Sequence, residues 1–371
     1  MTKRPPSLNR RSLLHGMAAV GAGGLLAACG DGSSPGSGSG SGSAKSGSGG
    51  NLPSSLKSLA DKATKEGQVR LFVSTDSRTP AHARKLSRAL RADTGADIEI
   101  KFVSGEPDPA FANKLVQEAK AQVAPSIDVF ATTPLVVKQL SGANLVQSVD
   151  WGSMDGVAAA DVWADHQGIY IAEIARTVLY NTKDIKAEDA PKSLEELLTD
   201  KWRGKIVTAG LPDVFSPLAA GLGVDKTLDF VRRLLENGRV SLASVPTAIR
   251  TQVSSGEFPI GYGVRIGERQ RVSKAPVDYA PIKVPVVPRA GLVVKGAKNP
   301  SASQLFLYWL NATEQGRKQA YEVLDWPRYT TPGTDLHVLA EKAGGVMTAD
   351  TDWWMNEYEK VNKQVAQLLR K

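Results

Sequence analysis

Residues 68–80 read QVRLFVSTDSRTP, and this stretch decides the fold class. Its apolar first half, with two valines and a phenylalanine, predicts a strand from Gln68 to Val73. A polar turn follows, and Pro80 then stands at a helix start, where its missing N–H costs nothing. A strand that passes through a short polar turn into a helix is the repeating unit of α/β proteins with largely parallel sheets.

The same unit recurs along the chain. Strands are expected at 97–103 and 127–131, each with a helix after it, and the alternation continues with different spacing from residue 169 to residue 310. Two extended segments, near 169–180 and 282–294, would cross between lobes. A chain of 371 residues also exceeds the size at which a single core stops growing. We therefore expect two α/β lobes joined by two hinge crossings.

The expected organisation has five parts. They are an export signal at 1–28, a lipidated cysteine with a Gly/Ser tether at 29–51, a first α/β lobe at 52–170 plus 285–325, a second α/β lobe at 171–284, and C-terminal helices at 326–371 packed on a lobe. Within the last part, the pair Trp353-Trp354 is expected to be core or lobe-contact material rather than a ligand platform.

The first part carries two targeting motifs. Residues 9–14 read NRRSLL, and a weakly apolar Gly/Ala stretch then leads to LAAC at 26–29, the order of an export signal. Arg10 and Arg11 resemble the twin-arginine signal, with general secretion as the alternative. The LAAC stretch resembles the bacterial lipobox, in which Cys29 receives a diacylglycerol. The apolar stretch is shorter than the ~20 residues that a transmembrane helix needs. We expect an exported protein held on the outer face of the cytoplasmic membrane by this lipid.

The charge of the chain does not indicate nucleic-acid binding. Its formal net charge is +8, but the leader holds Lys3, Arg4, Arg10 and Arg11 and no acidic residue, so the remainder carries +4. Basic and acidic residues alternate in that remainder, and no basic run interleaves with aromatic residues. We therefore expect no nucleic-acid partner.

An enzyme is the first alternative from a different class. The globular body from Leu52 onward contains no Gly-x-Ser-x-Gly nucleophile elbow, and the lone cysteine, Cys29, is assigned to the lipid. The histidines, at 15, 82, 166 and 337, have no metal-binding spacing. We expect no catalytic residues, no metal site and no cofactor.

Several segments together carry a family resemblance. They are LYNTK at 179–183, APKSLEEL at 190–197, KWRGKI at 201–206, GEFPIG at 256–261 and AGLVVKGAKNP at 290–300, with Asp128-Val129 at a strand that leads into a first-lobe turn. In order and spacing they resemble the iron(III)-type family of bacterial extracellular solute-binding proteins. The resemblance implies a type II periplasmic-binding-protein fold that closes over one small ligand. It also implies delivery to an ABC permease driven by a cytoplasmic ATPase.

The departures from this family bear on the ligand. Iron-binding members use a tyrosine pair shortly after the Gly-Glu segment, whereas this chain has one tyrosine, Tyr262, with Arg265 and Arg269 close by. An arginine that the family places before the first crossing is replaced by Ile174, although Arg176 remains nearby. Direct ferric binding is therefore disfavoured. Arginines instead suit a carboxylate, phosphonate or phosphate ester, because a guanidinium offers paired donors to paired oxygens.

Candidate ligand contacts lie on the turns at the carboxyl ends of strands, at the crossing and at helix starts. They are Ser74, Thr75, Arg78, Thr132, Thr133, Glu173, Arg176, Ser216, Thr247, Tyr262 and Arg265. Such turns collect on one edge of a parallel sheet, where helix N-termini favour small anions. Taken singly, each residue is more often a helix cap or a solvated group.

The expected function is capture of a small, anionic ligand for an ABC import system, by a protein that is monomeric. Two alternatives remain open at this point. One is binding of ferric ion or a ferric complex for iron import. The other is ligand sensing, in which the same clamp would feed a membrane receptor; both import and sensing need a ligand-closed surface that a membrane partner recognises.

Overall fold

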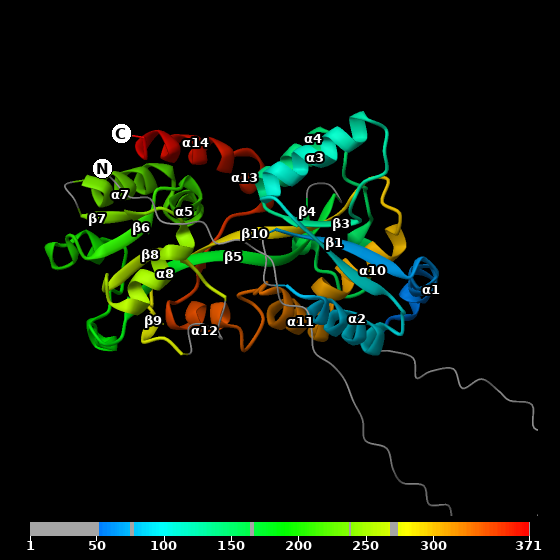
Figure 1. Ribbon diagram of the computed structural model, residues 1–371, viewed down its shortest axis with the longest axis horizontal. Coiled ribbons are helices and arrows are strands. Elements are labelled where there is room, and N and C mark those ends of the chain that lie inside the picture. Colours follow the sequence, from blue (N-terminus) through cyan, green and yellow to red (C-terminus); the bar gives the residue numbers. More distant parts are fainter. Residues whose placement is uncertain (1–51, 75–77, 164–166, 237–238, 268–273, 371) are drawn as a thin grey trace, which may run out of the picture. The chain divides into compact units, whose positions relative to one another are not determined.

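The computed structural model describes residues 52–74, 78–163, 167–236, 239–267 and 274–370 (Figure 1). The described residues all belong to one compact unit. The predictions made for Arg10, Arg11, Cys29 and Thr75 fall outside the described residues.

The first lobe is the part built around strands β1 to β3. Its strands are β1 (Gln68–Ser74), β2 (Glu99–Gly105) and β3 (Val129–Thr132), and its helices are α1 (Lys57–Glu66), α2 (Pro80–Thr94), α3 (Asp108–Lys120), α4 (Pro134–Gly142), α10 (Pro300–Ala312) and α11 (Glu314–Leu324). β1 pairs in parallel with both β2 and β3. The strand and the helix start predicted at the two ends of residues 68–80 are confirmed, with Thr79 and His82 forming a capping box at the start of α2.

Two long strands connect the halves of the unit. β5 (Gly168–Asn181) and β10 (Val284–Val293) run antiparallel side by side across the centre of Figure 1. Ile169 and Ile171 of β5 belong to the first-lobe core, whereas Val178 and Leu179 belong to the core of the other lobe. The two predicted crossings are therefore these strands.

The second lobe is the part built around strands β6 to β9. Its strands are β6 (Ile206–Ala209), β7 (Val240–Ala243), β8 (Ile260–Arg265) and β9 (Val277–Tyr279), and its helices are α5 (Pro212–Phe215), α6 (Ala219–Leu222), α7 (Val224–Leu235) and α8 (Pro246–Ser255). The continuous sheet has the order β2-β1-β3-β10-β5-β8-β6-β7. The sequence predicted one helix from Ser216 to Leu222, but a 3-10 turn at Ser216–Leu218 interrupts it, since Pro217 lacks an N–H for a helical hydrogen bond.

The C-terminal helices contact both lobes. α13 (Thr351–Asn356) and α14 (Tyr358–Leu368) lie at the top of Figure 1, where α13 adjoins α4 of the first lobe and α14 packs on α7 and α5 of the second. Trp354 is buried in a first-lobe cluster, and Val361 and Val365 are buried in the second-lobe core. No helix in the described part of the chain is long and apolar enough to cross a membrane.

Candidate functional site

Four arginines from different parts of the chain come together where the two lobes meet; we call Arg78, Arg176, Arg265 and Arg289 the arginine group. Arg78 follows β1, Arg176 lies on β5, Arg265 ends β8 and Arg289 lies on β10. The first three were predicted as contacts from the sequence. Their positive charges act on one another, because each of the other three lowers the pKa of Arg265.

Arg176 and Arg265 are direct partners in the antiparallel pairing of β5 with β8, so their side chains project from the same face of the sheet. The pKa of Arg265 falls to about 10 because the side chain is buried and because Arg289, Arg176 and Arg78 lie nearby, while Asp325 acts in the opposite direction. Like charges at paired positions cost stability. This arrangement therefore favours a bound negative charge.

Arg289 completes the group and was not predicted from the sequence. It is 8% exposed, and its Nη2 lies 3.3 Å from Oδ2 of Asp108 at the start of α3. Its guanidinium lies over the ring of Trp326, 5.2 Å from the centroid. Its Nε is buried and has no hydrogen-bond partner among the described residues. A charged residue inside the apolar run VPVVPRAGLV was the available signal.

Arginines of both lobes reach the C-terminus of α11. Arg78 donates from Nη2 to the carbonyl of Leu324, and Arg265 donates from Nη2 to the carbonyl of Asp325 at 3.5 Å. Cations at a helix C-terminus are favoured by its negative partial charge. Asp325 has a left-handed backbone, with φ 53°, and its carboxylate lies against Gly267. Among the described residues, three carboxylates, those of Asp108, Asp213 and Asp325, lie near the four guanidinium groups.

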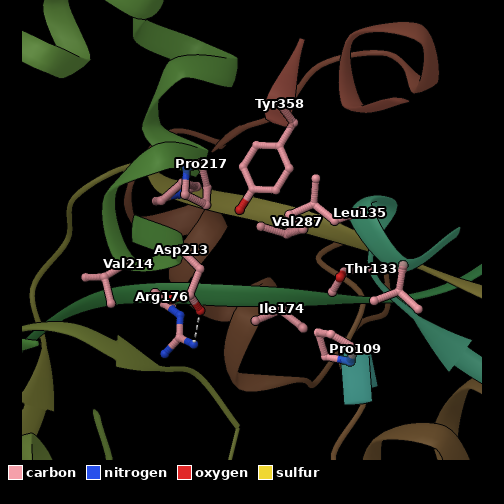
Figure 2. Close-up of a pocket in the computed structure, with 12 residues that line it drawn as sticks. Pro109, Thr133, Leu135, Ile174, Arg176, Asp213, Val214, Pro217, Val287 and Tyr358 are labelled. Atoms are coloured by element: carbon pink, nitrogen blue, oxygen red, sulfur yellow. Dashed lines mark hydrogen bonds and ion pairs between the residues drawn. The ribbon is translucent and has the colours of Figure 1, made fainter. Parts of the chain in front are cut away.

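A cavity of about 260 Å³ adjoins the arginine group (Figure 2). Its described lining is mostly aliphatic and comes from both lobes and both crossings; the residues are Pro109, Thr133, Leu135, Val136, Ile174, Arg176, Asp213, Val214, Pro217, Pro285, Val287 and Tyr358. We call this space the apolar cavity. Ile174 forms part of its wall; from the sequence we expected this residue to replace an arginine of the iron(III)-type family.

The few polar groups of the apolar cavity lie at distinct places. Arg176 pairs with Asp213 through Nη2 and Oδ2 at 2.9 Å, and the Asp213 side chain is 50% exposed, so solvent reaches this end. Thr133 precedes α4 but makes no capping hydrogen bond with its side chain, which leaves its hydroxyl for other partners. The pKa of the Tyr358 hydroxyl is raised because the group is buried. Figure 2 shows this hydroxyl directed toward Val287.

The family model for "Bacterial extracellular solute-binding protein" matches residues 85–331. The chain belongs to this family. Its members are binding proteins rather than enzymes, and the family description indicates that they act outside the cytoplasm. Among curated proteins, none is similar enough in sequence to count as a match.

Solved structures with the same fold include three from other bacteria. The ferric iron-binding protein A of Mannheimia haemolytica, in an open conformation, has a TM-score of 0.62 and 15% identity over 81% of this chain and 98% of its own. Trichodesmium IdiA (FutA), with iron and citrate, has a TM-score of 0.61 and 20% identity over 82% and 98%. PotD of Streptococcus pneumoniae, a spermidine/putrescine substrate-binding protein, has a TM-score of 0.58 and 12% identity over 81% and 99%. The solute-binding protein thus has the two-lobed type II fold that was expected.

Two of the predicted threonines of the solute-binding protein, Thr132 and Thr133, lie near the arginine group or the apolar cavity. Thr133 lines the apolar cavity, and the buried Thr132 donates from Oγ1 to Oδ2 of Asp108 at 2.9 Å. Thr132 thus orients the carboxylate that pairs with Arg289. Ser74 is the last residue of β1, opposite Gly105 of β2.

The remaining predicted contacts lie elsewhere. Tyr262 is 3% exposed inside the second-lobe core, stacked on Phe215 with ring centroids 5.3 Å apart. Ser216 is buried and donates to the Pro212 carbonyl at 2.7 Å, and Thr247 is exposed in the first turn of α8. None of these three lines the apolar cavity. A strand with one solvent-exposed face exposes every second side chain. Both faces of β8 are covered, so Tyr262 is buried and does not face a ligand site.

Glu173 lies one position from Ile174 on β5, so its side chain points to the face opposite the apolar cavity. Its Oε2 accepts from the backbone N–H of Tyr329 at 2.9 Å, and its Oε1 accepts from the hydroxyl of Tyr170. Burial raises the pKa of Glu173 to about 8, against the opposing charge of Arg328. Glu173 thus belongs to a buried network behind the crossing strand.

Within the described ranges of the solute-binding protein, no group of three or more His, Cys, Asp or Glu side chains could hold a metal ion. The carboxylates near the arginine group are instead paired with guanidinium groups, as Asp108 with Arg289 and Asp213 with Arg176.

Proposed function

We propose that this solute-binding protein captures a small organic anion between its lobes and delivers it to an ABC permease for import. The observation that carries the proposal is the arginine group. Its members come from both lobes and both crossings, and among the described residues they outnumber the three carboxylates near them. A carboxylate, phosphonate or phosphate ester would accept paired N–H groups from such guanidiniums.

The placement of the arginines also explains how binding would close the clamp. Arg78 belongs to the first lobe and Arg265 to the second, so one anion held by both would stabilise the closed form relative to the open form. Arg289 offers a buried Nε without a described partner. A ligand oxygen would satisfy a donor that is costly to leave unpaired.

Ferric ion fits this arrangement less well. The phenol of Tyr262 is stacked on Phe215 inside the second-lobe core, and burial raises its pKa, which disfavours the phenolate that a ferric ion needs. We therefore do not propose iron, which is named for the Trichodesmium and Mannheimia proteins, as the ligand of this chain.

Thermal unfolding tests the ligand class. The full chain is heated with small carboxylates, phosphonates, phosphate esters, polyamines or ferric citrate, since a ligand that binds only the folded state raises Tm. A shift with one anionic class supports the proposal. A shift confined to polyamines or to ferric citrate would overturn it. Reconstitution with the permease and ATPase then separates import from sensing, because only import moves the solute across the membrane.

We further propose that the protein is a monomer, exported through the twin-arginine route and anchored by a lipid on Cys29. The NRRSLL and LAAC motifs support the export route and the lipid anchor, and the Gly/Ser tether would let the lobes turn above the membrane. The proposed lobes span 52–170 with 285–325, and 171–284. Cys29→Ser should abolish labelling by a fatty acid and release the protein from membranes; a variant that stays labelled would contradict the anchor.

A further inference from the structure

We infer that the ligand is a monocarboxylate with an apolar body, and that this body occupies the apolar cavity beside Arg176. The inference rests on the proposed capture of an anion, and it adds the chemical class of the ligand. It is carried by the lining of the cavity, by its volume and by the single acidic residue at its solvent-exposed end.

The lining has little to offer a polar ligand body. Leu135, Ile174, Val214 and Val287 contribute only hydrocarbon surface, and three prolines add no side-chain hydrogen bonds. Apart from the hydroxyls of Thr133 and Tyr358, a ligand body that extends past Arg176 and Asp213 meets no polar side chain of the described lining, so a highly hydroxylated body would lose most of its hydration without replacement. Apolar surface, in contrast, gains free energy by leaving water. The wall therefore selects hydrocarbon for the part of the ligand that enters the cavity.

The volume limits the size of that part. An apolar cavity of about 150 Å³ is known to hold benzene. The cavity of about 260 Å³ here has room for one six-membered ring with a short chain or for a branched alkyl group of similar bulk. A larger body, such as a fused ring system with long substituents, would exceed it.

The charges set the position and number of carboxylates. Arg176 is the one basic residue in the described lining, and Arg265, its cross-strand partner, adjoins it. A carboxylate at this end would meet both guanidiniums while the body extends toward Ile174 and Leu135. Asp213, also at this end and half exposed, would repel a second negative charge on the ligand. A monoanion is therefore favoured over phosphate or a dicarboxylate.

The test measures binding of three probes to the full chain by titration calorimetry. 3-Phenylpropanoate has both the carboxylate head and the apolar body that we propose. Acetate has the carboxylate head alone, and 3-phenylpropan-1-ol has the apolar body alone. We expect 3-phenylpropanoate to bind at least about tenfold more tightly than either partial probe, because burial of the ring adds to the charge-assisted hydrogen bonds.

The outcomes separate the inference from the function it rests on. Equal binding of acetate and 3-phenylpropanoate would overturn the apolar body and leave anion capture standing. Equal binding of the alcohol and 3-phenylpropanoate would overturn the anionic head, and with it the proposed function. Binding of none of the three at millimolar concentration would overturn the inference, while a response to phosphonates or phosphate esters in the thermal panel would keep anion capture.

Variants locate the body in the cavity. Leu135→Phe narrows the apolar cavity and should weaken 3-phenylpropanoate at least about tenfold while changing acetate less than about threefold. The matched control is Leu145→Phe, a partly buried first-lobe leucine outside the cavity. Ile174→Phe provides a second narrowing if Leu135→Phe lowers Tm without ligand. Unchanged 3-phenylpropanoate binding in a folded narrowing variant would place the ligand elsewhere and overturn the inference.

Discussion

Arg176 on β5 and Arg265 on β8 are direct cross-strand partners. Two guanidinium groups thus occupy a pair of positions where unlike charges or apolar side chains would be more stable. Their repulsion and the burial of Arg265 lower the pKa of Arg265 to about 10. Both effects reduce the stability of the ligand-free protein. We interpret the pair as stability given up for anion binding, a common relation at binding sites.

Replacement of Arg265 should therefore separate binding from stability. Arg265→Gln should weaken the tightest anion of the panel about 10- to 100-fold, the loss of a charge-assisted hydrogen bond of about 1.5–3 kcal/mol. Tm without ligand should not fall, because a desolvated charge is removed. Calorimetry and thermal unfolding measure the two effects. The control is Arg232→Gln, since the Arg232 side chain is 52% exposed. Equal affinity of the two variants for the anion would show that Arg265 does not contact the ligand.

Asp213 pairs with Arg176 in this structure, and we expect it to compete with an anionic ligand for this guanidinium. Asp213→Asn should tighten anion binding by up to about fivefold, because the pair is half exposed and such pairs contribute about 0.2–1 kcal/mol. The gain should be larger for a dianion such as succinate than for acetate. Calorimetry with both anions checks this, with Asp229→Asn as an exposed control. Weaker binding of both anions in Asp213→Asn would show that this carboxylate assists the ligand instead.

Gly267 allows the close approach of β8 to Asp325. A Cβ at this position would lie 2.5 Å from Oδ1 of Asp325, and the backbone has φ +120°. Gly267→Ala should lower the free energy of unfolding by about 1–3 kcal/mol, because a Cβ at this position would collide with the Asp325 carboxylate. Gly345→Ala matches the backbone strain, with φ +118° and nothing within 4 Å. Equal losses in urea unfolding would mean that the contact with Asp325 contributes nothing.

Glu173 should make stability depend on pH. Its pKa is about 8 in the folded protein against 4.5 for an unperturbed glutamate, so the folded state holds the proton over this interval and the unfolded state does not. The free energy of unfolding should therefore decrease as pH rises from about 4.5 to about 8. Glu173→Gln should flatten this decrease in urea titrations, while the exposed Glu188→Gln should keep the wild-type slope. A wild-type slope in Glu173→Gln would show that the carboxyl is ionised throughout.

Trp354 holds the C-terminal helices against the first lobe. It is 1% exposed and packs edge-on against Tyr358, with ring centroids 5.0 Å apart. Trp354→Ala should lower the free energy of unfolding by about 3–5 kcal/mol. Trp353→Ala, at the partly buried neighbour, should cost less. Urea unfolding compares the two, and the reverse order would contradict the packing described for α13.

Much of the fold was predictable because local patterns determine it. The strand–turn–helix unit at β1 and α2 and the crossings β5 and β10 follow from side-chain periodicity, turn residues and helix caps. α12 (Asp335–Lys342) lies within the C-terminal helices expected at 326–371, whereas α11 was not predicted. In α11 the obstacle is Gly316, which normally weakens a helix but here approaches the Trp309 carbonyl so closely that no Cβ would fit.

The candidate site was predictable only in part. Arg78, Arg176 and Arg265 were inferred as arginines near turns and crossings, whereas Tyr262 and Ser216 face a core that no local pattern reveals. Arg289 was missed because it interrupts an apolar strand, and periodicity does not report that segments distant in the sequence supply Asp108 and Trp326 around it.

The sequence by itself determined the α/β class, the two crossings and the supply of arginines, because each depends on residues close together in the chain. Only the tertiary structure decided which arginines meet and where apolar surface remains open. Arg78 and Arg265 are far apart in sequence, yet they donate to the carbonyls of Leu324 and Asp325, which are adjacent residues at the end of α11. The apolar cavity likewise exists only because Leu135, Val214 and Tyr358 come from elements that pack against the same two strands. Such long-range packing depends on the whole core rather than on any local segment.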